Sequence, residues 1–216
     1  ERAELLDLVD RYSDCFSDKP GFTIASQHEI KLKPGFQPKR LHSYKVPDRL
    51  KTEVSKQIDE MLKLGIIRES NSPMASPLVC VLKGPNGQDG VRLVCDFRFI
   101  NKFTVADEFP MGDISGILQR IGGSRYISKF DVKSAYWQTA VKEEDRWLTA
   151  FICDRGQFEW NRTPFGARNA GASWCRAVKK VIEPISEFTD SYVDDMCVFS
   201  DGWGQHLRQV ELYFKE

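Results

Sequence analysis

The stretch Ser191-Tyr192-Val193-Asp194-Asp195-Met196-Cys197-Val198-Phe199-Ser200 places two acidic residues between two short apolar runs. Aromatic and β-branched residues on both sides are typical of strands, so the Asp pair is predicted to form the tip of a β-hairpin. Adjacent like charges repel, and each needs hydration, a basic partner or a bound cation to stay ionised at neutral pH. Two interpretations are therefore open, a solvated turn and a divalent metal site.

A second acidic site follows another strand-like run. Residues 126–132 read Tyr-Ile-Ser-Lys-Phe-Asp-Val, so that Asp131 comes near the end of the run, just before a chain turn at residues 133–138. Strand ends can be brought together by pairing of adjacent strands. We therefore expect Asp131, Asp194 and Asp195 to share one metal site.

Five segments in order carry a family resemblance. Tyr192-Val193-Asp194-Asp195 resembles the Tyr-x-Asp-Asp box of reverse transcriptases, and residues 130–138 resemble their first catalytic motif. Thr163-Pro164-Phe165-Gly166-Ala167-Arg168-Asn169-Ala170 is similar to a box of gypsy-type long-terminal-repeat retrotransposons. Residues 71–77 and 92–98 complete the family's order. The chain thus resembles the fingers and palm of the reverse transcriptase in such a retrotransposon polyprotein.

The resemblance implies an α+β fold, with a palm built on an antiparallel sheet, a fingers subdomain and no thumb. It assigns residues 1–45 to an N-terminal arm that follows a protease-like region, and residues 46–108 to the fingers. Residues 109–142 form the palm segment with the first catalytic Asp, 143–162 return to the fingers, and 163–216 form the palm segment with the Tyr-x-Asp-Asp hairpin.

The implied activity is that of an RNA-directed DNA polymerase, a nucleotidyltransferase that joins a dNTP to a primer 3′-hydroxyl by a two-metal mechanism. Two Mg²⁺ ions are the expected cofactors, and Mn²⁺ can substitute for them. Asp131 and Asp194 are predicted to bridge both ions, with the backbone of Val132 as a further ligand. Asp195 is predicted to lie further from the ions in the same site, where it aids the geometry or the charge of the metal site.

Substrate contacts are expected from further residues of the same boxes. Strands at residues 77–83 and 91–97, joined by a turn at 84–90, put Lys83 and Arg92 near one loop, where the family grips the triphosphate. The alternative is that both merely keep a hairpin soluble. Tyr136 stands at the family's steric gate against a 2′-hydroxyl, although it could equally be a core aromatic. Phe165 and Gly166 complete the predicted substrate-binding set.

Composition sets limits on the compartment and the partners. The 216 residues are 41% hydrophobic and 29% charged, with six scattered cysteines that we expect to be free thiols in a reducing compartment. No long apolar run or signal peptide is visible, so we expect an intracellular protein, in the cytoplasm or a virus-like particle, without membrane contact. Expected partners are an RNA or DNA template with its primer, dNTP, and the missing thumb, connection and ribonuclease H regions. A net charge of zero predicts weak nucleic-acid binding by this chain alone.

Several residues depart from the family's usual pattern. Gly171, Trp174 and Cys175 replace the Pro, Phe and Gln of one box. Three further departures are Met74, Gly112 and Leu148, which stand where Trp, Pro and Lys are common in the family. The alternative function is therefore a catalytically inactive fragment that acts as a binding module. A two-metal phosphatase or nuclease leaves the order of the other boxes unexplained, and no His–Cys arrangement supports a thiol enzyme.

Periodicity predicts most of the remaining elements. Apolar residues at helical spacing predict a short N-terminal helix and a helix over residues 48–64 that Gly65 ends. The same reasoning predicts a short helix with Ile114, Ile117, Leu118 and Ile121 on one side, a hairpin over residues 149–160 and a helix over 169–182.

Overall fold

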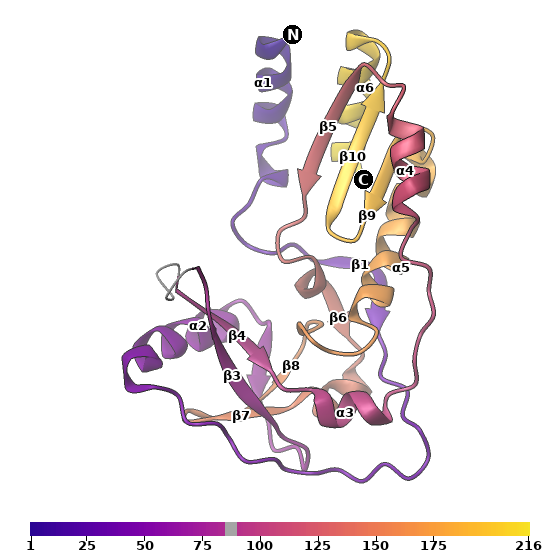
Figure 1. Cartoon of the computed structure of the whole chain (residues 1–216). Coiled ribbons are helices and arrows are strands. Elements are labelled where there is room, and N and C mark those ends of the chain that lie inside the picture. The colour runs from indigo at the N-terminus through magenta and orange to yellow at the C-terminus, as the bar shows by residue number, and fades with distance from the viewer. Residues whose placement is uncertain (85–89) are drawn as a thin grey trace. The chain divides into compact units, whose positions relative to one another are not determined.

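A computed structural model of the chain describes residues 1–84 and 90–216, and the turn predicted at 84–90 lies largely outside the described residues. The chain has the expected α+β fold and forms two compact units (Figure 1). The first unit comprises Glu1–Ser26, Glu108–Gln138 and Gly171–Glu216, and the second comprises Gln27–Asp107 and Thr139–Ala170. The structure therefore builds each unit from segments that are far apart in the sequence.

The first unit contains a three-stranded antiparallel sheet in the order β5-β10-β9. Its strands are β5 (Tyr126–Asp131), β9 (Thr189–Tyr192) and β10 (Asp195–Ser200). Figure 1 shows β10 in the middle of the three. Side chains alternate between the two faces of β5, so that Ile127, Lys129 and Asp131 are exposed.

Four helices accompany this sheet. They are α1 (Arg2–Arg11), α4 (Ile114–Ile121), α5 (Ala170–Ile182) and α6 (Trp203–Lys215). The buried cluster beneath the sheet joins Met196 of β10 to Trp174 and Val178 of α5, and Phe130 of β5 packs against it. Helices α1 and α6 add a second cluster around Val198. The apolar side of α4 is less covered than its pattern implies, since Leu118 is 64% exposed.

The second unit contains a five-stranded mixed sheet in the order β2-β8-β7-β3-β4, in which only the pairing of β3 with β7 is parallel. The strands are β2 (Ile67–Glu69), β3 (Ser76–Leu82), β4 (Val91–Cys95), β7 (Phe151–Cys153) and β8 (Gly156–Trp160). This confirms the hairpin expected over residues 149–160. The apolar run at residues 77–83 suggests a buried strand, but β3 is buried only in its first half, because Val81 and Leu82 are exposed.

Helix α2 (Lys51–Lys63) packs on this unit with Val54, Ile58 and Met61 buried. It ends before Gly65, whose φ of +65° is a conformation that glycine adopts without steric cost. A short 3₁₀ turn occupies the first residues of the predicted helix. Four other short elements were not predicted, because runs of three to six residues carry too little periodicity. They are β1 (Thr23–His28), strand β2, α3 (Arg98–Phe103) and β6 (Thr139–Val141). Helix α6 was not predicted either.

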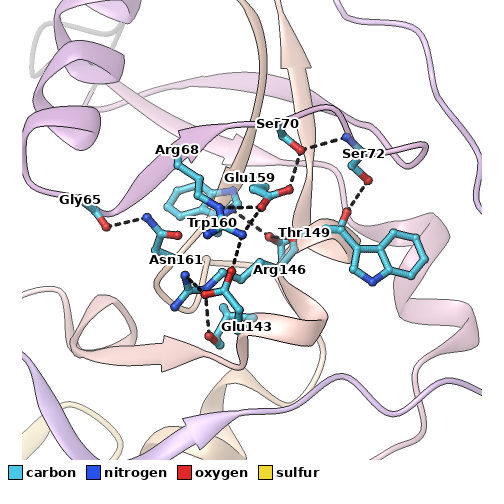
Figure 2. Close-up of polar contacts among 12 residues, drawn as sticks. Gly65, Arg68, Ser70, Ser72, Glu143, Arg146, Thr149, Glu159, Trp160 and Asn161 are labelled. Carbon is cyan, nitrogen blue, oxygen red and sulfur yellow. Dashed lines mark hydrogen bonds and ion pairs between the residues drawn. The ribbon is translucent and has the colours of Figure 1, made fainter.

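An ionic network ties strand β2 to strand β8 in the second unit (Figure 2). Arg68 donates through Nε to Glu159 Oε1 at 2.8 Å and also contacts Glu143 Oε1 through Nη2 at 2.7 Å. Ser70 Oγ donates to Glu159 Oε2 at 2.5 Å, and Arg146 forms an ion pair with the other oxygen of Glu143. The Glu159 side chain is only 9% exposed, so these donors replace the water that a buried carboxylate loses.

Candidate active site

The register of the first sheet brings the predicted acidic residues to one end of adjacent strands. Asp195 of β10 lies directly opposite Asp131 of β5, and the backbone N–H of Val132 donates to the Asp194 carbonyl oxygen at 3.0 Å. Residues opposite one another in an antiparallel pair point to the same face of the sheet. The prediction for the hairpin tip needs a correction, because the two loop residues are Val193 and Asp194, whereas Asp195 is already paired with Tyr192 in the ladder.

The hairpin turn is conformationally strained. Val193 has φ of +56°, which is sterically unfavourable for a β-branched side chain. Two-residue hairpin loops nevertheless require positive φ at their first position, or at both positions, to match the twist of the strands. The indole Nε1–H of Trp174 on α5 donates to the Val193 carbonyl oxygen at 2.6 Å. This contact was not foreseen, because a hydrogen bond between residues 19 positions apart leaves no local pattern in the sequence.

The three carboxylates have different surroundings. Lys129 Nζ lies 2.9 Å from Asp195 Oδ1, on the same face of the sheet as Asp131. In the described part of the chain, the exposed side chains of Asp131 and Asp194 form neither an ion pair nor a hydrogen bond. The Asp195 carboxylate raises the pKa of Lys129, and the charges of Asp131 and Asp194 act in the same direction. Lys129 was not singled out in the sequence, although its position two residues before Asp131 put it on the same face.

The donor set at this site suits a hard divalent cation. No group of three or more His, Cys, Asp or Glu side chains among residues 1–84 and 90–216 is arranged to hold a metal ion. Mg²⁺, however, is usually held by one or two carboxylates together with substrate phosphates and water, and not by a complete protein cage. The free carboxylates of Asp131 and Asp194, with the adjacent Val132 carbonyl, are oxygen donors of that kind. These residues therefore fit Mg²⁺.

Tyr136 lies next to the acidic residues in the same unit. It belongs to a short 3₁₀ turn (Ala135–Gln138) and packs, half-buried, against the cluster that contains Trp174. Burial raises the pKa of the Tyr136 hydroxyl, and the charge of Asp194 raises it further. Both effects keep the phenol neutral. The neighbouring Trp137 is also half-buried.

The remaining predicted residues belong to the second unit. Arg92 lies opposite Val81 in the β3–β4 ladder, and the backbone N–H of Lys83 donates to the Gly90 carbonyl at 2.9 Å, so both basic side chains stand at the same end of this hairpin. Both are exposed. Phe165 is half-buried, and Gly166 has φ of +86° with its carbonyl accepting from Asn101 Nδ2 at 2.9 Å.

Residues 82–216 match the family model described as reverse transcriptase (RNA-dependent DNA polymerase). The chain belongs to the reverse transcriptase family. Members of the family are RNA-directed DNA polymerases, which are nucleotidyltransferases, and they generally use divalent metal ions. The family resemblance expected from the order of the five boxes is thereby confirmed.

Curated relatives of this reverse transcriptase include polyproteins of retroelements. The Pol polyprotein from transposon opus of Drosophila melanogaster is 39% identical over 173 residues, which cover 79% of this chain and 17% of the relative. The Pol polyprotein from transposon gypsy of the same organism is 39% identical over 166 residues, or 75% of this chain and 16% of the relative. The enzymatic polyprotein of cauliflower mosaic virus is 35% identical over 188 residues, which cover 87% of this chain and 26% of the relative. The chain thus spans from 16% to 26% of the length of these relatives.

Solved structures agree with the fold. A crystal structure of the prototype foamy virus protease–reverse transcriptase superposes with a TM-score of 0.86 at 27% identity, covering 99% of this chain and 28% of that chain. The foamy viral protein in complex with an RNA/DNA hybrid gives 0.87 at 25% identity, with the same coverage. No helix in the described part of this reverse transcriptase is both long and apolar enough to cross a membrane.

Two departures from the family pattern, Gly112 and Leu148, have a visible structural reason. Gly112 has φ of +93°, a value that the ring of the usual proline forbids. Met74 is fully buried, and Leu148, where lysine is common, is only 2% exposed. An apolar residue suits position 148 because a buried ammonium group without a partner is costly. These replacements agree with a packed fold.

Proposed function

We propose that this chain carries the catalytic centre of a polymerase that transfers a nucleotide from dNTP to a primer 3′-hydroxyl with the help of two Mg²⁺ ions. The observation that carries the proposal is the β5–β10 register, with Asp131 opposite Asp195 and Asp194 tied to Val132. Among the described residues, the side chains of Asp131 and Asp194 are exposed and unpaired, so their hydrated carboxylates are available to bind a cation.

Each acidic residue has a distinct role in this proposal. Asp131 and Asp194 offer their carboxylates as metal ligands, and the Val132 carbonyl is a third oxygen donor. Asp195 is paired with Lys129, so it contributes less negative charge to the site and acts on its geometry and potential. When bound, the two ions would lower the pKa of the primer hydroxyl and neutralise the charge on the triphosphate and the leaving pyrophosphate.

The substrate contacts are proposed from chemistry. The Lys83 ammonium group supplies a point charge, and the Arg92 guanidinium group can donate two parallel hydrogen bonds. Both suit a triphosphate. Tyr136, neutral and fixed by packing, is proposed to lie against the sugar and to exclude a 2′-hydroxyl, with Phe165 and Gly166 also contacting the nucleotide. Template and primer are the proposed macromolecular partners, in line with relatives whose structures were determined with an RNA/DNA hybrid and with double-stranded DNA.

Primer extension with and without Mg²⁺ or Mn²⁺ tests this proposal. Asp131→Asn removes a charge at nearly constant volume, and we expect it to abolish nucleotide incorporation while the thermal unfolding midpoint stays near that of the wild type. Asp201→Asn is the matched control, since Asp201 is an exposed acid just beyond the other end of strand β10. The control variant should incorporate nucleotides as the wild type does.

Two results would overturn the proposal. The first is a folded wild-type chain that binds template-primer but incorporates no nucleotide with either metal, which would favour the inactive binding module. The second is an equal loss of activity in Asp131→Asn and Asp201→Asn, which would show a general effect of surface charge.

A further inference from the structure

Trp174 makes a polar contact with the hairpin loop that carries Asp194. The side chain belongs to the core cluster beneath the sheet and the residue is 5% exposed. Its indole Nε1–H, the only polar group of the side chain, donates to the Val193 carbonyl at 2.6 Å. The hydrogen bond thus connects a helix in the core to the first residue of the hairpin loop.

The residue that accepts this hydrogen bond is also the strained one. Val193 has φ of +56°, where its β-branched side chain is disfavoured, and such a conformation persists only when the surroundings hold it. Asp194 is the next residue, and its carbonyl oxygen accepts from the Val132 N–H at 3.0 Å. A change of the Val193 backbone would therefore move Asp194 relative to Asp131.

We propose that Trp174 is a positioning residue, whose indole N–H holds Val193 in its positive-φ conformation and thereby fixes Asp194 beside Val132 and Asp131. The catalytic consequence rests on the proposed function, because it matters only if Asp194 acts in nucleotide transfer. The structural consequence, which is the position of Asp194 beside Val132, does not depend on the proposed function.

Trp174 is one of three residues of α5 that depart from the family's usual pattern. Gly171, Trp174 and Cys175 lie at positions i, i+3 and i+4 of α5, which is one face of the helix. A Cβ atom at position 171 would lie 3.3 Å from Met111 Sδ and 3.7 Å from Tyr136 Oη, so this face is closely packed. A phenylalanine at position 174, as in the usual box, could fill the same core but has no N–H to donate.

Trp174→Phe separates the hydrogen bond from the packing. The Val132 amide reports the position of Asp194, so its hydrogen exchange, followed by nuclear magnetic resonance, measures the proposed effect without metal or substrate. We expect Trp174→Phe to raise the exchange rate of this amide about fivefold, as for loss of one hydrogen bond. Trp203→Phe is the matched control, because Trp203 Nε1 donates to Glu4 Oε2 at 2.9 Å in the same unit, outside the hairpin loop.

Val193→Gly tests whether the hydrogen bond acts against backbone strain. Glycine adopts positive φ without steric cost, so the conformation no longer depends on the indole. In the Val193→Gly background, Trp174→Phe should change the Val132 exchange rate less than about twofold. An undiminished effect of Trp174→Phe in this background would show that Trp174 acts by packing alone.

Single-nucleotide incorporation by the same chain gives the catalytic readout. Trp174→Phe should lower kcat about fivefold and leave KM for dNTP within about twofold, because the lost contact is to the turn and not to the nucleotide. Trp203→Phe should leave both constants unchanged. If the wild type incorporates no nucleotide, the proposed function fails, and the exchange measurement still decides the role of Trp174. Wild-type exchange of Val132 in Trp174→Phe would overturn the inference.

Discussion

Two acidic sites, Glu159 in the second unit and Asp131 with Asp194 in the first, have opposite surroundings. In the second unit, Glu159 is 9% exposed and receives hydrogen bonds from Arg68 and Ser70. In the first unit, Asp131 and Asp194 are exposed and have no side-chain partner among the described residues, and Asp194 follows a strained backbone. A buried carboxylate must be paired for the fold to be stable, whereas an exposed unpaired one remains available to a ligand.

This difference separates carboxylates that stabilise the fold from carboxylates that are available to a ligand. Removal of a partner from Glu159 should change the free energy of unfolding, because it leaves a buried charge. Removal of charge from Asp194 should change activity and leave stability nearly unaffected. The predictions below test this contrast.

Asp194→Asn should give the largest effect. We expect nucleotide incorporation to fall about a thousandfold, since the substitution removes a charged metal ligand at nearly constant size. The free energy of unfolding should stay within about 0.5 kcal/mol of the wild type, as is usual for exposed side chains without partners. Single-turnover primer extension and urea unfolding measure the two quantities. A large loss of stability would remove the contrast between the two regions.

Arg68→Met should have the next largest effect, and on stability. It leaves Glu159 buried with Ser70 as its remaining side-chain partner, and we expect a loss of about 2 kcal/mol. This figure is lower than for fully buried pairs because Arg68 itself is 42% exposed. Urea unfolding followed by circular dichroism gives the value. Lys51→Met is the control, since it breaks the exposed pair with Asp48, and its unfolding midpoint should match that of the wild type.

Mild acid should produce the smallest effect. Burial lowers the pKa of His28 to about 4, below the value of about 6.5 in an unfolded chain. Between pH 7.5 and 5.5 the unfolded state takes up a proton that the folded state does not, so His28 should reduce stability by about 1.4 kcal/mol. His206 of the first unit, whose pKa burial also lowers, acts with the same sign.

His28→Gln isolates the contribution of the second unit to this pH dependence. The stability difference between pH 7.5 and 5.5, measured by urea unfolding, should be smaller in the variant than in the wild type. An identical difference would show that His28 is not held neutral. His206→Gln makes the corresponding test in the first unit, where Ser128 and Ser200 contact the imidazole.

Much of the architecture was predictable from local patterns. The helical spacing of Val54, Ile58 and Met61 indicated α2, and the strand-like runs around Asp131 and Asp194 indicated β5 and the β9–β10 hairpin. The order of five boxes identified the family. Elements without such periodicity were missed, among them α3 and β1, because so few residues do not distinguish a helix from a strand or a loop.

The sequence by itself therefore determined the family, the class of fold and the acidic residues that form the candidate site, because these can be recognised from residue types and short spacings. Only the tertiary structure decided that Asp195 pairs with Lys129, that Asp194 has no side-chain partner among the described residues, and that the Trp174 indole donates to the Val193 carbonyl. Those facts depend on the register of two strands and on the position of a helix beneath them. A shift of one residue in that register would exchange the two faces of the strand, and no local pattern shows which partner a side chain will meet across the fold.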